Sequence, residues 1–80
     1  MNPNPIHIGL LVRTELFRQQ QTVKWLSEQL SIQRANCYRI LNAPSVHTEL
    51  LVKLSLFMHH DFFTDCSNAI RPIIENNNHQ

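Results

Sequence analysis

The sequence of 80 residues contains a single glycine, Gly9, and this scarcity of glycine constrains the fold more than any other feature. Tight hairpins between β-strands depend on glycine-containing turns with positive φ, so a hairpin-rich β fold is disfavoured. Apolar residues instead recur with the spacing of amphipathic helices. We therefore predict an all-α protein.

Length and composition allow one small domain. Leucine, isoleucine, valine and phenylalanine supply 25 of the 80 residues, enough for one hydrophobic core. A core of this size gives modest stability, so dimerisation would help the fold. We expect neither a membrane span nor a secretory signal, because no apolar run is long enough for either. Two cysteines, Cys37 and Cys66, fit core thiols in a reducing cytoplasm better than a disulfide scaffold.

The apolar spacing predicts five helices between two disordered ends. The expected helices cover about residues 6–20, 23–30, 33–41, 46–58 and 62–70. Thr22 and Asp61 are the expected N-caps of the second and fifth helices. Residues 1–5 should form a disordered arm, and residues 71–80 a disordered tail, because Pro72 should stop the last helix. The folded domain is then expected to span residues 6–70.

Each expected helix has one apolar stripe that should face a common core. The predicted core residues are Ile8, Val12, Leu16, Leu26, Leu30, Cys37, Ile40, Leu41, Val46, Leu50, Leu54, Phe57, Met58, Phe62, Phe63, Cys66 and Ile70. Trp25, beside the stripe of the second helix, either seals the edge of the core or stays partly exposed.

Residues 22–42 have the pattern of two short helices joined by a tight turn. Leu26 and Leu30 supply the inner face of the first helix, and Ser27 is small where the two helices must approach closely. Cys37 and Ile40 pack back from the second helix. This pattern predicts a helix-turn-helix.

Residues in all five expected helices match one family pattern without a gap from about residue 8 to residue 70. The matching residues are Ile8, Gly9, Val12, Arg13, Thr22, Leu26, Ser27, Ile40, Asn42, the apolar run Leu50–Phe57, and Asp61, Phe62 and Phe63. On these residues the chain resembles the Cro/repressor-type (lambda repressor-like) helix-turn-helix family of phage repressors and their bacterial relatives. The resemblance implies a five-helix DNA-binding domain, with the second and third helices as the helix-turn-helix, and the function of a transcriptional regulator.

Four positions depart from the family pattern. Gln20 and Ser31 stand where the family has loop and turn glycines, and Cys37 replaces a β-branched residue. Ser31 would be strained by about 1–2 kcal/mol if its backbone is left-handed. Val23 replaces a glutamine that often touches DNA, which removes one polar contact.

The resemblance makes residues 33–41 the recognition helix in the major groove, where the first residues of such a helix contact base edges. Arg34 and Arg39 could take guanine O6 and N7, and Ala35 could touch a thymine methyl group. Gln33 could read a base or cap the helix. The alternative for Arg34 and Arg39 is that both are only solvated charges.

Arg13, Thr22, Lys24 and Tyr38 are assigned to phosphates. Thr22 opens a helix whose exposed amides can hold a phosphate, but it could also serve as a cap alone. Arg13 could reach a phosphate or tie the first helix to a neighbouring carboxylate. The assigned partner is double-stranded DNA.

The distribution of charge supports an anionic partner for the first half of the chain only. Residues 1–45 carry five basic and two acidic side chains, whereas residues 46–80 carry two basic and four acidic ones. The overall net charge is only +1, which favours an alternative function. In this alternative the domain is a helical protein-interaction module, such as an antitoxin-like partner, that has lost or weakened DNA binding.

The last helix and the segment after it carry more apolar residues than one short helix can bury, which predicts a homodimer. The predicted interface residues are Phe62, Phe63, Ile70, Ile73 and Ile74. Relatives in the family commonly dimerise through their last helices, and this would bring two recognition helices about 34–36 Å apart, one turn of DNA.

Catalysis and metal binding are not expected. The chain has no phosphate-binding glycine loop and no nucleophile with a matching base and orienting group. His59, His60, Asp61 and Cys66 match no zinc spacing, so a turn followed by a helix cap is the better interpretation. We therefore expect no enzyme activity, no cofactor and no metal.

Overall fold

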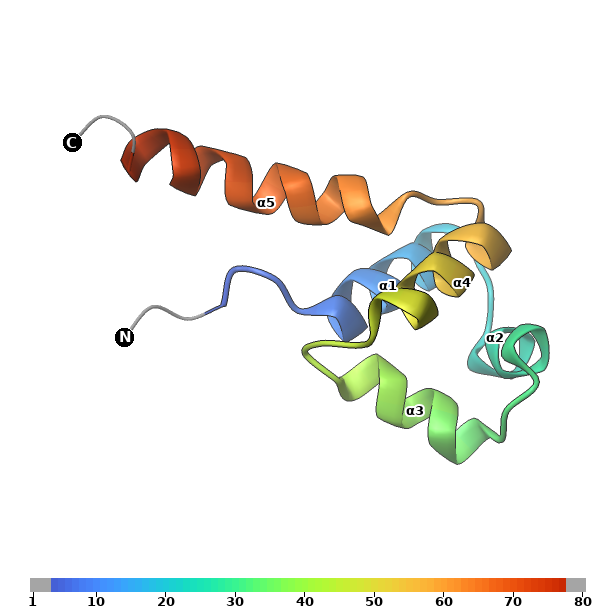
Figure 1. The fold of residues 1–80 in the computed structure, drawn as a ribbon. Coiled ribbons are helices and arrows are strands. Elements are labelled where there is room, and N and C mark those ends of the chain that lie inside the picture. The colour runs from blue at the N-terminus through green and yellow to red at the C-terminus, as the bar shows by residue number, and fades with distance from the viewer. Residues whose placement is uncertain (1–3, 78–80) are drawn as a thin grey trace.

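The computed structural model describes residues 4–77, and every regular element within them is an α-helix (Figure 1). The five helices are α1 (Ile8–Arg18), α2 (Val23–Leu30), α3 (Arg34–Asn42), α4 (Thr48–Met58) and α5 (Phe62–Asn77). The predicted all-α class and the five helices are confirmed, and the bounds of α1–α4 differ from the predicted ones by at most two residues. Part of each predicted disordered end, residues 1–3 and 78–80, lies outside the described residues.

Pro72 does not end α5, so the predicted stop is wrong. The helix passes through Pro72 to Asn77, and residues 71–77 are helical instead of forming a tail. The fixed φ of proline lies in the helical range, so a helix can continue through it at the cost of one missing hydrogen bond and some crowding. The second half of α5 extends away from the other helices (Figure 1), which contributes to a long dimension of 47 Å.

The core gathers around α1, which packs against α3 and α5. Its buried apolar residues are Ile8, Val12, Leu16, Leu26, Cys37, Leu41, Leu51, Leu54, Met58 and Phe62. All of them except Leu51 are predicted core residues. Trp25 is half-buried and packs against this core, so it lies at the core edge and is also partly exposed.

Three predicted core residues are exposed instead: Phe57, Phe63 and Ile70. On α4, Leu51, Leu54 and Met58 face the core, so the helix is rotated away from Phe57. On α5, Phe63 and Ile70 are 41% and 39% exposed.

Gly9 sits where α1 meets the chain segment that follows α3. The amide of Ile8 donates to the carbonyl of Pro44 at 3.0 Å, and the amide of Gly9 donates to the carbonyl of Ala43 at 2.8 Å. A Cβ atom on residue 9 would lie 2.3 Å from the Leu41 carbonyl oxygen and 2.8 Å from the Ala43 carbonyl oxygen. The close approach of two backbones, and not an unusual φ, therefore requires glycine here.

The predicted helix caps are confirmed. The hydroxyl of Thr22 accepts a hydrogen bond from the amide of Trp25 at 3.0 Å. The carboxylate of Asp61 accepts from the amides of Phe63 and Thr64 at 3.0 and 3.2 Å. These side chains satisfy amides that have no partner within their own helices.

Three helices are followed within two residues by a left-handed residue that is not glycine. Gln20, Ser31 and His59 have φ values of 58°, 56° and 50°. Past Ser31, the amide of Ile32 donates to the carbonyl of Ser27 at 2.9 Å, the bond that closes a left-handed helix end. The strain predicted for Ser31 is therefore present in the structure.

Replacing Ser31 with glycine should stabilise the protein. The substitution removes a left-handed strain of about 1–2 kcal/mol but adds backbone freedom to the unfolded chain, for a net gain of about 0.5–1 kcal/mol. Urea unfolding followed by circular dichroism measures the change. Gln29→Gly, at an exposed helical position on α2, is the control and should lose about 1 kcal/mol. A loss of stability in Ser31→Gly would contradict the left-handed turn.

A buried carboxylate links α1 to the turn between α4 and α5. The side chain of Glu15 is only 6% exposed, and its carboxylate accepts hydrogen bonds from Nε of Arg18 at 3.0 Å and Nε2 of Gln19 at 2.7 Å. Nδ1 of His60 lies 3.5 Å from the same carboxylate, and Nε2 of His60 lies 2.6 Å from the carboxylate of Asp65. Sequence analysis counts Glu15 only as one of the two acidic side chains of residues 1–45, so this network is an addition from the structure.

Acid should weaken the fold partly through Glu15. Hydrogen bonding from Arg18 lowers the pKa of Glu15 below its ordinary value of 4.5, with further help from Gln19 and His60, although burial acts in the opposite direction. A lowered folded-state pKa gives stability that is present above the unfolded-state pKa and lost as the pH falls through the folded-state pKa. We therefore expect the free energy of unfolding to decrease as the pH falls below about 4.5.

Urea unfolding at several pH values tests this expectation with the variant Glu15→Gln, which should show a smaller decrease in stability under acid. Asp61→Asn should reduce the decrease independently, because hydrogen bonds from Thr64 lower the pKa of Asp61 as well. An unchanged acid profile in Glu15→Gln would show that the carboxylate has no part in it.

Candidate nucleic-acid interface

All four predicted base-contacting residues are exposed, on the outer face of α3 or at its start. Cys37 and Leu41 turn inward and are 0% and 4% exposed, so the opposite face of the helix points to solvent. Ala35 and Arg39 lie on this opposite face, and Gln33 and Arg34 are exposed at the start of the helix. Gln33 occupies the N-cap position, but its side chain makes no capping hydrogen bond, so its amide is available to a ligand.

The turn between α2 and α3 is short and holds the two helices against each other. Residues 31–33 connect them, and Sγ of Cys37 lies 3.9 Å from the carbonyl oxygen of Val23. Ser27, which is 4% exposed, supplies the small buried residue that close approach of α2 requires. The exposed face of α3 is therefore carried on a packed pair of helices.

Three of the residues assigned to phosphates lie exposed near this face. Thr22 and Lys24 lie at the start of α2, and Tyr38 lies on the flank of α3 with 53% of its surface exposed. The hydroxyl of Thr22 is used as a cap, which leaves the first amides of α2 as the groups that could meet a phosphate.

Arg13, the fourth residue assigned to phosphates, connects α1 to the end of α3. Its Nε donates to the carbonyl of Leu41 at 3.1 Å, and its Nη2 donates to Oδ1 of Asn42. The expected tie therefore exists, but it joins Arg13 to a helix end and not to a carboxylate. A cation is favourable there because the carbonyl end of a helix carries partial negative charge.

The cations around α3 are not neutralised by neighbouring acids. Among residues 4–77, ion pairs involve only Arg18 with Glu15, and His60 with Glu15 and Asp65. Lys24, Arg34 and Arg39 take part in none of them. Their charge is therefore available to an anionic partner.

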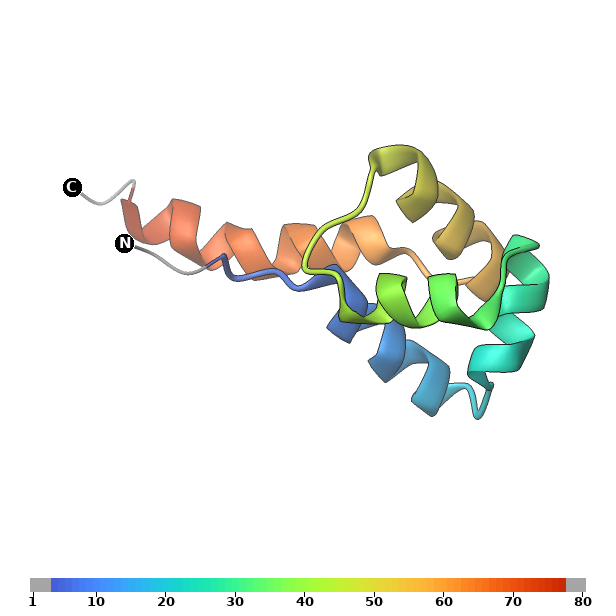
Figure 2. The same ribbon diagram turned by 90° about the horizontal axis from the view of Figure 1, so that it is seen from below.

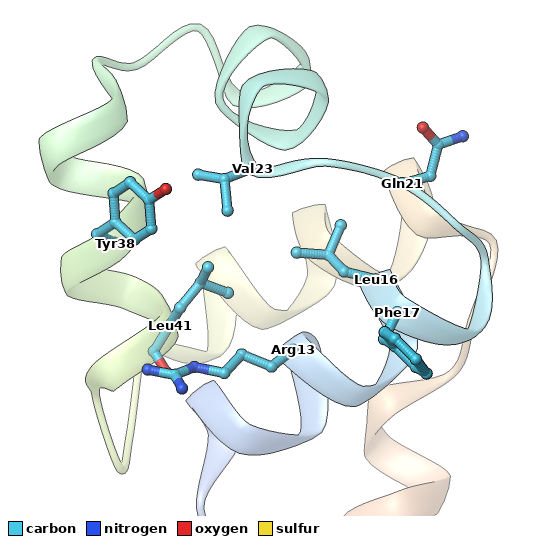
Figure 3. A pocket seen from close by; sticks show the side chains of 7 residues that line it. All are labelled: Arg13, Leu16, Phe17, Gln21, Val23, Tyr38 and Leu41. Carbon is cyan, nitrogen blue, oxygen red and sulfur yellow. The ribbon is translucent and has the colours of Figure 1, made fainter.

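A pocket opens beside α3 on the side of α1 and α2 (Figure 3). Its volume is about 360 Å³, and its apolar lining consists of Leu16, Phe17, Val23, Tyr38 and Leu41. Phe17, on the rim, is 87% exposed. Sequence analysis misses Phe17 because it lies outside the buried stripe of α1, although Leu10, seven residues earlier, marks the same exposed apolar face.

The remaining chemical groups are unremarkable as sites. Cys37 is buried and Cys66 half-buried, and both are free thiols. Burial raises the pKa of both thiols, and the Asp65 carboxylate adds to the effect at Cys66. In the part of the chain that the structure describes, no three metal-binding side chains come together, and no helix has the length and apolarity needed to cross a membrane.

Comparison with known proteins adds no family to this description. No protein-family model, no curated protein and no solved structure matches the chain.

Proposed function

We propose that the protein is a sequence-specific double-stranded DNA-binding regulator with the Cro/repressor-type fold, in which α2 and α3 form the helix-turn-helix. The observation that carries the proposal is the exposed face of α3, where Arg34 and Arg39 are free of ion pairs within residues 4–77. An α-helix fits the major groove of DNA, and arginine is the side chain best suited to guanine O6 and N7.

The proposed contacts with DNA are of two kinds, those with base edges and those with phosphates. Ala35 and Arg39 are assigned to base edges because they lie on the outer face of α3, and Gln33 and Arg34 because they are exposed at its start. Lys24, Tyr38 and the start of α2 are assigned to phosphates. Arg13 is a weaker candidate for a phosphate, because the end of α3 already takes hydrogen bonds from its guanidinium group.

The same proposal includes a homodimer formed through α5. Four apolar residues of this one uninterrupted helix are between 39% and 51% exposed: Phe63, Ile70, Ile73 and Ile74. Phe62, which sequence analysis also assigns to the interface, is fully buried and is therefore a core residue. A two-fold dimer places two copies of α3 on a palindromic site with a spacing of about one DNA turn, 34–36 Å.

Selection of bound sequences from a random duplex library, followed by fluorescence anisotropy at several salt concentrations, tests DNA binding. Arg34→Ala should lose about 1–3 kcal/mol on the selected duplex and relax the preference at one base pair. Lys24→Ala should weaken the selected and scrambled duplexes alike and lower the salt slope by about one.

Two results would count against the proposal at different levels. If Arg34→Ala binds the selected duplex as tightly as the unmutated protein, Arg34 does not read a base. If the unmutated protein binds neither duplex at low salt, DNA binding itself is wrong.

A specific observation favours the protein-interaction module as the second candidate. Phe17, Val23 and Tyr38 form an apolar rim beside the start of α2, where phosphate contacts are expected. Exposed apolar groups are more typical of a protein interface than of a phosphate-binding surface. Absence of DNA binding would therefore leave this rim as the surface to test.

A further inference from the structure

A second pocket flanks α3 on the side opposite the pocket of Figure 3. In Figure 2, α3 runs between α1 and α4, and this pocket lies between α3, the end of α2 and the first half of α4. Its volume is about 450 Å³, within the usual range for small-molecule sites. Its apolar lining consists of four half-buried residues, Leu30, Ile32, Ile40 and Leu50.

Two cations and one amide complete the lining of this pocket. Arg39 of α3 and Lys53 of α4 contribute the positive charges, Asn36 contributes the amide, and no acidic residue takes part. Neither cation forms an ion pair within the described chain, and Glu49, one turn before Lys53 on α4, does not reach it. The pocket therefore combines an aliphatic surface with uncompensated positive charge.

This combination matches one kind of ligand, a molecule with an apolar body and a carboxylate. The body would leave water for the aliphatic lining, and the carboxylate would accept charge-assisted hydrogen bonds from the cations. A neutral apolar molecule would leave both cations without a partner, and a polar anion would leave the aliphatic lining exposed to water.

We propose that this pocket binds a small apolar monocarboxylate, and that its occupancy weakens DNA binding. The second part rests on the proposed function, because Arg39 belongs both to the pocket and to the outer face of α3. A carboxylate paired with Arg39 withdraws that guanidinium from the bases and places a negative charge beside the DNA. The ligand is thus an effector that competes with DNA for one side chain.

Octanoate is a suitable probe, and octanamide is its neutral counterpart of the same length. In an NMR titration of the full chain, octanoate should shift the amide signals of Ile32, Asn36 and Leu50. We expect octanoate to bind about fivefold more tightly than octanamide, the size of effect that a partly exposed ion pair provides. Equal binding of the two molecules, or shifts confined to α5 or to the pocket of Figure 3, would overturn the site.

Lys53→Gln is the decisive variant, because it removes charge from the pocket without altering any residue assigned to DNA. It should reduce the preference for octanoate over octanamide, because Arg39 then remains as the pocket's single cation, whereas Lys24→Gln, which removes the same charge from α2, should leave the preference unchanged. An undiminished preference in Lys53→Gln would show that the carboxylate is not held between the two cations.

The regulatory part is tested separately with the selected duplex. Octanoate at a concentration near saturation for the unmutated protein should lower its DNA affinity about fivefold, and the same concentration should have a smaller effect on Lys53→Gln, which binds octanoate more weakly. Octanoate binding without an effect on DNA affinity would overturn the regulatory part alone. If no duplex is bound at all, the proposed function fails, and the NMR titration still decides whether the pocket takes a carboxylate.

Discussion

Replacing Gly9 with alanine should cost the protein about 3 kcal/mol of stability or more. The added Cβ would lie 2.3 Å from the Leu41 carbonyl oxygen and 2.6 Å from the Leu41 carbonyl carbon, and these backbone atoms cannot rotate away as a side chain can. To make room, α1 must move away from the end of α3, which strains the hydrogen bonds from the Ile8 and Gly9 amides. A chain of this length has a total stability of only about 4–12 kcal/mol.

Thermal and urea unfolding followed by circular dichroism measure this loss, which should lower Tm by about 12 °C or more. Leu10→Ala is the control, because the neighbouring side chain of Leu10 is 57% exposed and its removal should cost less than about 1 kcal/mol. Alanine is a better helix former than glycine, so without the close approach Gly9→Ala would be stabilising. A gain in stability would therefore show that α1 and the end of α3 do not meet as described.

Ile74→Glu should convert the proposed dimer into a folded monomer. Ile74 lies 51% exposed on the second half of α5, so a charge at this position should leave the monomer intact but place an unpaired carboxylate in an apolar interface. Loss of the second half-site should then lower the affinity for a palindromic duplex by about 100-fold or more. Light scattering measures the molar mass, and anisotropy measures the affinity.

Asn68→Glu is the matched control, since it adds the same charge to the exposed opposite side of α5. This variant should remain dimeric and bind DNA normally. The α5 interface would be excluded if the unmutated protein is a monomer at high micromolar concentration with and without DNA, or if Ile74→Glu remains a dimer.

The local features of this chain could be predicted from sequence because their causes are local. The 3.6-residue spacing of apolar side chains sets the helices, and Thr22 and Asp61 cap them with hydrogen bonds to amides two or three residues away. The exposure of Arg39 follows from the same spacing, because Arg39 lies on the side of α3 away from Cys37 and Leu41. Arg34 is exposed because it is the first residue of the helix.

Other features depend on how the helices meet, which spacing alone does not specify. The rotation of α4 decides that Leu51 is buried and Phe57 is exposed, although both belong to apolar stripes. The contact of α1 with the turn after α4 places Glu15 beside His60. Pro72 removes one hydrogen bond from a helix, and the sequence does not show whether the helix ends there or continues past it.

The sequence by itself thus determined the helices, their caps and the outward face of α3, because each depends on side chains within a few residues of one another. Only the tertiary structure decided that Gly9 touches the backbone of Leu41 and Ala43, and that Arg39 and Lys53 share the rim of one pocket. These pairs are far apart along the chain and carry no common periodicity. The packing of the helices brings them together, and this packing is set by the shape and burial of the whole core.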